Sequence, residues 1–149
     1  MKSLIVDMIV LSKSKLKLLR EMFTLTKKQR VFIEDKNIDS LNEILEKKEE
    51  IIERINELDK SFNKLKVNLN EYGVEDIKDI DSFKYPNAKD LKKIQRDIKK
   101  ILLDLKEIDE YNNKLSKEVL KKFKSNVKGI KKSRRVTNIY NQNMNRRMY

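Results

Sequence analysis

The sequence predicts an all-α protein, an antiparallel bundle of three long helices with an extended C-terminal helix and a basic tail. Three observations carry this prediction. Charged residues make up 40% of the 149 residues, and glycine occurs only twice and proline once. The turn-forming residues of a loop-rich or many-stranded fold are therefore scarce. Apolar residues recur every three to four positions over long stretches, which is the period of an amphipathic helix. The chain length is that of one domain.

A first helix is predicted over residues 3–34. Seven of nine positions spaced alternately by four and three are apolar, and a second apolar seam runs beside the first. A stripe of this width contacts two neighbouring helices, which favours a bundle over a two-stranded coiled coil. The first seam consists of Leu4, Met8, Leu11, Lys15, Leu18, Met22, Leu25, Gln29 and Phe32.

A second helix is predicted over residues 39–72. Asn37 and Asp39 can accept hydrogen bonds from the free N–H groups at its start, and Gly73 can adopt the left-handed conformation that ends a helix. Lys48 interrupts the apolar seam of this helix, as Lys15 interrupts that of the first. We expect both lysines to pack their alkyl stems on the bundle while their ammonium groups reach water.

Residues 74–85 are expected to connect the second helix to a third, with one helical turn around residues 74–80. Pro86 pushes the residue before it out of the helical region. Asn87 and Asp90 then resemble a capping box. The third helix is therefore predicted over residues 87–128.

The third helix carries an apolar seam from Leu91 to Val119, with Asn112 as its polar position. The two interpretations of this asparagine are a contact that sets helix register and a contact with a ligand. At about 1.5 Å per residue the third helix reaches on the order of 60 Å, against about 50 Å for the others. We therefore expect it to leave the bundle near Val119.

The chain is predicted to divide into a bundle, residues 1–130, and a basic, flexible tail, residues 131–149, because few apolar residues follow Gly129. Residues 111–149 hold 12 lysines and arginines against 1 acidic residue, which accounts for most of the net charge of +12. Such a tail contacts nucleic acid, an acidic membrane surface or an acidic protein face, and composition does not choose among them.

Several function classes are disfavoured by what the sequence lacks. Without cysteine or histidine it has no disulfide, no thiolate, no imidazole base and few ways to hold zinc. We therefore expect no enzyme activity, no cofactor and no metal site. The apolar run Leu4 to Leu11 is interrupted by Asp7 and is far shorter than the roughly 20 residues that span a bilayer. It also lacks a cleavage site, so we expect no membrane insertion and a cytoplasmic location.

The order of these segments resembles the FlgN family of flagellar export chaperones. The resemblance rests on Lys28-Gln29-Arg30 near the end of the first helix, the turn from Asp35 to Leu41, and the helix around Leu45 to Ile52. The Tyr111 to Leu115 stretch and the Tyr140-Asn141-Gln142 tail fit the same outline.

This resemblance implies a cytoplasmic chaperone that binds the C-terminal helical segments of hook-associated proteins. Such a chaperone prevents their premature assembly and delivers them to the type III export gate. By position, Ile139 and Tyr140 are candidates for docking to the export apparatus. The candidates for client binding are Leu115, Val119, Leu120, Phe123, Val127 and Ile130.

Two alternatives stay open. The apolar spacing of the candidate client face is equally that of a buried bundle core. The basic tail allows a coiled-coil protein that binds nucleic acid or serves as a scaffold, although no helix-turn-helix, zinc-finger or basic-zipper layout accompanies it. The sequence does not choose between a monomer and a homodimer, and it does not name the client.

Overall fold

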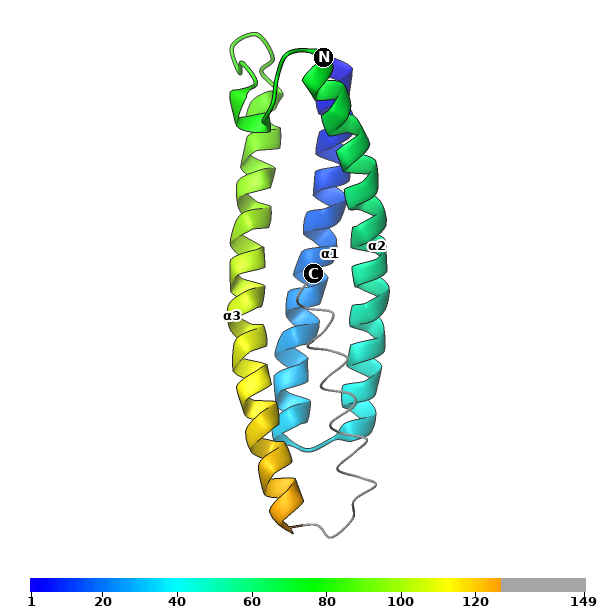
Figure 1. The fold of residues 1–149 in the computed structure, drawn as a ribbon, viewed down its shortest axis with the longest axis vertical. Helices are drawn as coiled ribbons and strands as arrows, with labels where there is room; N and C mark the ends of the chain where they lie inside the picture. Colours follow the sequence, from blue (N-terminus) through cyan, green and yellow to red (C-terminus); the bar gives the residue numbers. More distant parts are fainter. Residues whose placement is uncertain (127–149) are drawn as a thin grey trace. The chain divides into compact units, whose positions relative to one another are not determined.

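The computed structural model describes the backbone of residues 1–126 and the side chains of residues 1–122, and this part of the chain is helical without strands (Figure 1). The helices are α1 (Lys2–Glu34), α2 (Ile38–Glu71) and α3 (Ala88–Asn126), with a short 3-10 turn, η1 (Ile77–Asp79), between α2 and α3. The all-α fold class is therefore confirmed, and each helix begins within one residue of its predicted start.

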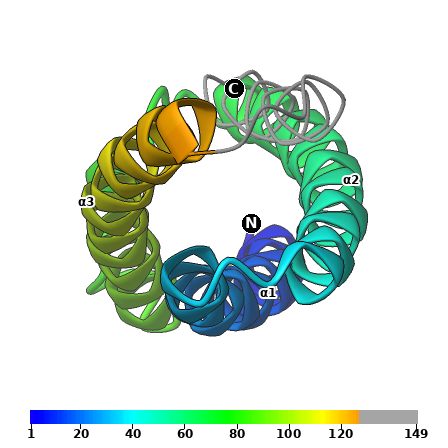
Figure 2. The ribbon, with the colours of Figure 1, turned by 90° about the horizontal axis from the view of Figure 1, so that it is seen from below.

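The turn between α1 and α2 is the short cyan segment in Figure 2, and both helix ends are capped within it. Lys36 adopts a left-handed conformation with φ of 55°. Its N–H donates to the Ile33 carbonyl at 3.2 Å, and the Asn37 N–H donates to the Phe32 carbonyl at 3.0 Å. The Asn37 side chain then accepts from the Ser40 N–H at 3.2 Å, so the predicted cap is confirmed for Asn37.

The end of α2 follows the same geometry with glycine in the left-handed position. Gly73 has φ of 78°, and its N–H donates to the Asn70 carbonyl at 2.9 Å. The Val74 N–H reaches the Leu69 carbonyl at 3.4 Å. The predicted stop at Gly73 is therefore confirmed, and η1 lies within the predicted helical turn of residues 74–80.

The predicted capping box at the start of α3 is wrong. The Asn87 amide nitrogen donates instead to the Lys2 carbonyl at 3.4 Å, which ties the connector to the first turn of α1. The other side-chain atom, Oδ1, is buried and accepts no hydrogen bond from the described residues. The Asp90 N–H donates to the backbone carbonyl of Asn87 at 3.2 Å, so only the backbone part of the expected cap forms.

The chain divides into two compact units, and every helix contributes to both. Unit 1 consists of Met1–Met22 with Glu50–Leu103, and unit 2 consists of Phe23–Glu49 with the chain from Asp104 onward. Unit 1 includes the α2–α3 connector and unit 2 the α1–α2 turn. The predicted boundary between residues 130 and 131, and the predicted tail, lie outside the described residues.

The cores of the two units differ in their apolar content. One cluster in unit 1 joins α1, α2, the connector and α3, and its buried members are Ile5, Met8, Leu69, Ile77, Ile80, Ala88 and Leu91. The corresponding cluster in unit 2 has two buried members, Ile33 and Leu41. Half-buried side chains complete it: Phe32, Ile38, Leu45, Leu115, Val119 and Leu120. Among the described helices, none has a stretch apolar and long enough to cross a membrane.

Candidate functional site

A buried polar cluster of unit 2 lies where α1, α2 and α3 meet. Lys48 of α2 is 3% exposed, and its ammonium donates to Gln29 Oε1 of α1 at 2.8 Å. Asp109 Oδ1 of α3 lies 3.7 Å from the same nitrogen. The expectation that this ammonium reaches water is therefore wrong, because neighbouring helices supply polar partners inside the unit. Both Gln29 and Lys48 interrupt apolar seams, and that shared irregularity was the available sequence signal.

Asn112 extends this polar cluster along α3. It is fully buried, and its amide nitrogen donates to the Thr26 carbonyl of α1 at 2.9 Å. Its Oδ1 accepts no hydrogen bond from the described residues. A side-chain bond to one particular backbone carbonyl is satisfied in only one alignment of the two helices. The contact therefore favours the register interpretation of this asparagine.

The predicted client-binding face begins one helical turn after the polar cluster. Leu115, Val119 and Leu120 are half-buried and pack on the cluster of Ile33 and Leu41. The departure of α3 predicted near Val119 is thus not seen as far as Leu120. Apolar residues on either side of the α1–α2 turn supply this contact, which helix length alone does not reveal.

The remaining predicted site residues are placed less completely. Phe123 lies within α3, but its side chain is outside the described ones. Val127 and Ile130, predicted for the client, and Ile139 and Tyr140, predicted for docking, lie outside the described residues. Three of the six predicted client-binding side chains therefore pack against one buried cluster, and their role in client binding stays a prediction.

Aromatic and charged groups of α1 and α3 also meet in unit 2. The Arg30 guanidinium carbon lies 4.7 Å from the centre of the Tyr111 ring, and Arg30 Nε donates to Glu34 Oε1 at 3.2 Å. On α3, Lys114, Lys117 and Lys121 are exposed.

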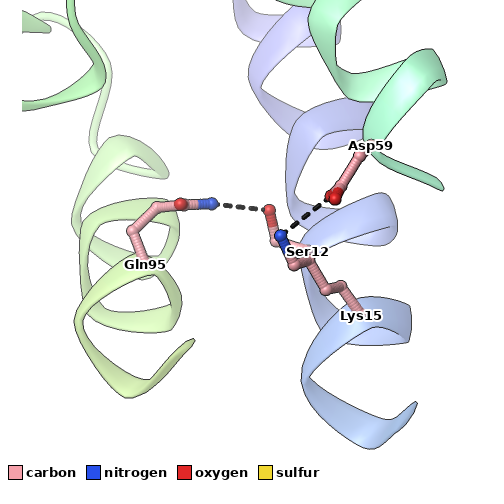
Figure 3. Close-up of polar contacts among 4 residues, drawn as sticks. All are labelled: Ser12, Lys15, Asp59 and Gln95. Atoms are coloured by element: carbon pink, nitrogen blue, oxygen red, sulfur yellow. Dashed lines mark hydrogen bonds and ion pairs between the residues drawn. The ribbon is translucent and has the colours of Figure 1, made fainter. Parts of the chain in front are cut away.

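Polar contacts in unit 1 are structural in character (Figure 3). Lys15 Nζ of α1 donates to Asp59 Oδ1 of α2 at 2.8 Å, and both side chains are partly exposed. Gln95 Nε2 of α3 donates to Ser12 Oγ of α1 at 2.8 Å. Because the Ser12 hydroxyl faces an amide and not a base, this arrangement does not activate a nucleophile.

A groove of about 580 Å³ lies between α1 and α2 in unit 1. Each helix contributes four residues, and the charged ones are two cations and two carboxylates. No group of three or more potential metal ligands occurs among the described residues. The groove is lined by Ser14, Lys17, Leu18, Glu21, Arg54, Glu57, Leu58 and Ser61.

Comparison with protein families adds an independent finding to this geometry. The family model described as FlgN protein matches residues 1–147. Searches of curated proteins and of solved structures gave no match. The match extends over nearly the whole chain, through both units. The chain therefore belongs to the FlgN family, which is a family of flagellar export chaperones and not of enzymes.

Proposed function

We propose that this protein binds the C-terminal helical segments of hook-associated proteins, prevents their premature assembly and delivers them to the flagellar export gate. The observation that carries the proposal is the half-buried apolar face of α3, formed by Leu115, Val119 and Leu120. The same helical spacing continues through Phe123, Val127 and Ile130. Family membership supports the general chaperone role, and the face supports the choice of a helical client.

The physical basis is incomplete burial. Fully burying one large apolar side chain contributes about 1.5–3 kcal/mol, and each of the three described residues retains part of that contribution for a partner. An amphipathic client helix that packs along α3 would complete the burial in the helix-in-groove manner. The client helix would then bury its apolar face against the chaperone, as it later buries that face in its own assembly.

Further elements of the proposal concern the rest of the chain. We place docking to the export apparatus on Ile139 and Tyr140, and we assign the protein to the cytoplasm. The three helices are proposed to form one antiparallel bundle that α3 extends, an arrangement supported within unit 1 by the Lys15–Asp59 and Ser12–Gln95 contacts. Homodimer formation stays an alternative to a monomer, and light scattering of the purified chain distinguishes the two.

The test is co-expression with hook-associated proteins followed by titration calorimetry of the purified pair. The double variant Val119→Asp with Phe123→Asp is expected to weaken the complex by at least roughly tenfold, because charged groups replace apolar contacts. Leu102→Asp with Leu103→Asp is the matched control on the same helix, since these leucines are 44% and 60% exposed. Circular dichroism checks that both proteins stay helical.

A milder variant keeps the test valid if the double variant unfolds. Val119→Thr preserves side-chain shape and replaces one methyl group with a hydroxyl, and we expect it to weaken the complex measurably while the unfolding temperature stays close to that of the parent. An unchanged affinity in folded Val119→Asp with Phe123→Asp protein would reject this face as the client site. Equal losses in the Leu102 and Leu103 control would indicate a general effect of charge.

Nucleic-acid binding is the second candidate, and the exposed Lys114, Lys117 and Lys121 on α3 are the observation that favours it. Phosphate contacts release counterions, so the affinity would fall steeply with salt. A client helix held by apolar burial would be far less sensitive. Deleting residues 131–149 removes six basic residues and should weaken nucleic-acid binding strongly but leave much of the client affinity, which separates the two functions.

A further inference from the structure

The connector between α2 and α3 presents one aromatic side chain almost completely to solvent. Phe83 is 98% exposed, whereas the other exposed large apolar residues in the described chain are at most 60% exposed. Isolated apolar residues are common on protein surfaces. What sets Phe83 apart is the way in which its loop is held.

Asp81 organises this loop through three hydrogen bonds. Its Oδ1 accepts from the Phe83 N–H at 2.9 Å and from the Lys84 N–H at 3.4 Å. Its carbonyl accepts from the Tyr85 N–H at 2.9 Å. An aspartate that binds the backbone two and three residues ahead fixes the turn between them. The backbone of Phe83 is therefore held from its N-terminal side.

A lysine of α3 anchors the same loop to the body of unit 1. Lys92 Nζ donates to the Ile80 carbonyl at 2.7 Å and to Ser82 Oγ at 3.0 Å. Ile80 is 2% exposed and Ala88 is fully buried, so the loop leaves and re-enters the core at fixed points. The exposure of Phe83 is consequently a property of a braced loop.

The neighbours of Phe83 turn toward the protein and leave the ring uncovered. Tyr85 packs on the apolar cluster of unit 1, and the Lys84 ammonium lies 5.6 Å from the centre of the Tyr85 ring. Ser82 is half-buried and engaged by Lys92. A single phenyl ring thus projects from a surface that is otherwise polar.

We propose that Phe83 is an anchor residue that inserts into a preformed apolar pocket of a folded partner protein. A lone projecting ring fits a pocket, whereas a client helix requires a continuous strip such as that on α3. The braced loop reduces the entropy lost on binding. This surface shares no residue with the proposed client site, so it provides for a second partner of the same chaperone.

The charge of the connector indicates the chemistry around that pocket. Residues 75–87 hold four acidic and two basic side chains, and Glu75, Asp76 and Asp79 are exposed. An anionic lipid surface would repel this segment. The partner is therefore a protein whose apolar pocket has basic side chains on its rim.

The test places a benzophenone amino acid at position 83 of the full-length protein in the cells that express it, with position 67 as control. Val67 lies on α2 and is 60% exposed. Irradiation is expected to give one protein adduct at position 83 that is not formed at position 67. The protein in that adduct is then purified, and its affinity for the unmodified chain is measured by calorimetry.

Two variants connect that affinity to the proposed geometry. Phe83→Ser is expected to weaken binding by roughly 30-fold or more, as for other anchor residues, without lowering the unfolding temperature. Asp81→Ala retains the phenyl ring but frees the turn, and we expect a smaller loss of roughly threefold to tenfold. Tyr72→Ser, directly after the end of α2, where the tyrosine is 58% exposed, should leave the affinity unchanged.

Several results would overturn the proposal. These are equal affinity of the parent and Phe83→Ser, an adduct only with a second copy of this chain or with lipid, and no adduct specific to position 83. The double variant Val119→Asp with Phe123→Asp separates this surface from the proposed function. Loss of client binding with a retained position-83 adduct is expected, because the two sites bind different partners.

Discussion

Unit 1 and unit 2 are built from the same three helices, but they bury different side chains. Of the eighteen buried apolar residues in the described chain, fourteen belong to unit 1. Of the six buried polar or charged residues, five belong to unit 2, namely Thr26, Gln29, Lys48, Asn112 and Ser116. Unit 2 therefore buries more polar side chains than unit 1, although fewer residues of unit 2 are described.

This difference in buried side chains indicates which unit opens at the smaller free-energy cost. Apolar burial is non-directional and contributes most of the favourable free energy of folding, so unit 1 has the character of a scaffold. Buried polar groups favour one arrangement through their hydrogen bonds, but their desolvation offsets much of the gain. Unit 2, which carries the half-buried face of α3, is the part we expect to open at the smaller free-energy cost.

The largest contrast is expected from matched leucine truncations on α3. Leu91 is fully buried in the unit 1 cluster, and Leu91→Ala should lower the free energy of unfolding by about 2–5 kcal/mol. Leu115 is half-buried in the unit 2 cluster, and Leu115→Ala should lower it by about 1 kcal/mol. Urea unfolding followed by circular dichroism measures both, and losses of equal size would remove the distinction between the units.

The polar cluster supplies the second test. Asp109→Leu removes the carboxylate near the buried Lys48 ammonium, and we expect a loss of about 2 kcal/mol in the free energy of unfolding. Adding Lys48→Met should restore most of that stability, because an apolar pair replaces a buried charged pair of similar volume. Hydrogen exchange should locate the recovered protection in unit 2.

The matched control for this pair is the more exposed ion pair of unit 1. Lys15 and Asp59 side chains are 24% and 42% exposed, so Lys15→Met should change stability by only about 0.2–1 kcal/mol. A double variant Lys48→Met with Asp109→Leu that is less stable than Asp109→Leu alone would contradict our account of the polar cluster.

Small effects are also expected at the two left-handed helix ends. A side chain at Gly73 meets no atom within 4 Å, so Gly73→Ala tests backbone strain alone and should lose about 1 kcal/mol. Lys36 in unit 2 already bears that strain, and Lys36→Gly should gain about 0.5 kcal/mol after the greater unfolded-state entropy of glycine is subtracted. Thermal unfolding measures both, and a destabilising Lys36→Gly would show that the lysine side chain compensates for its backbone.

The helices and their ends were predictable because the relevant interactions are local. Apolar periodicity located α1, α2 and α3, while Asn37 and Gly73 act on backbone groups only a few residues away. Asn87 failed as a capping residue because a distant backbone carbonyl, that of Lys2, takes its amide hydrogen bond. Local sequence could not reveal that competition.

The candidate site divides in the same way. The apolar positions Leu115, Val119 and Leu120 follow from helical spacing, but their partners Ile33 and Leu41 come from two other helices. The sequence does not predict the exposure of Phe83, because an aromatic residue in a polar connector can be either buried or exposed. Its exposure depends on how Asp81 and Lys92 brace the loop around it.

The sequence by itself determined the helical character, the start of each helix to within one residue, the concentration of basic residues after Tyr111 and the resemblance to the FlgN family. Tertiary structure alone decided that Lys48 is buried beside Gln29 and Asp109, that Asn112 bonds to the α1 backbone, and that Phe83 stands free. The physical reason is the sequence separation over which each kind of interaction acts. Periodicity and capping act within one or two helical turns, whereas burial and pairing depend on residues separated by tens of positions in the chain.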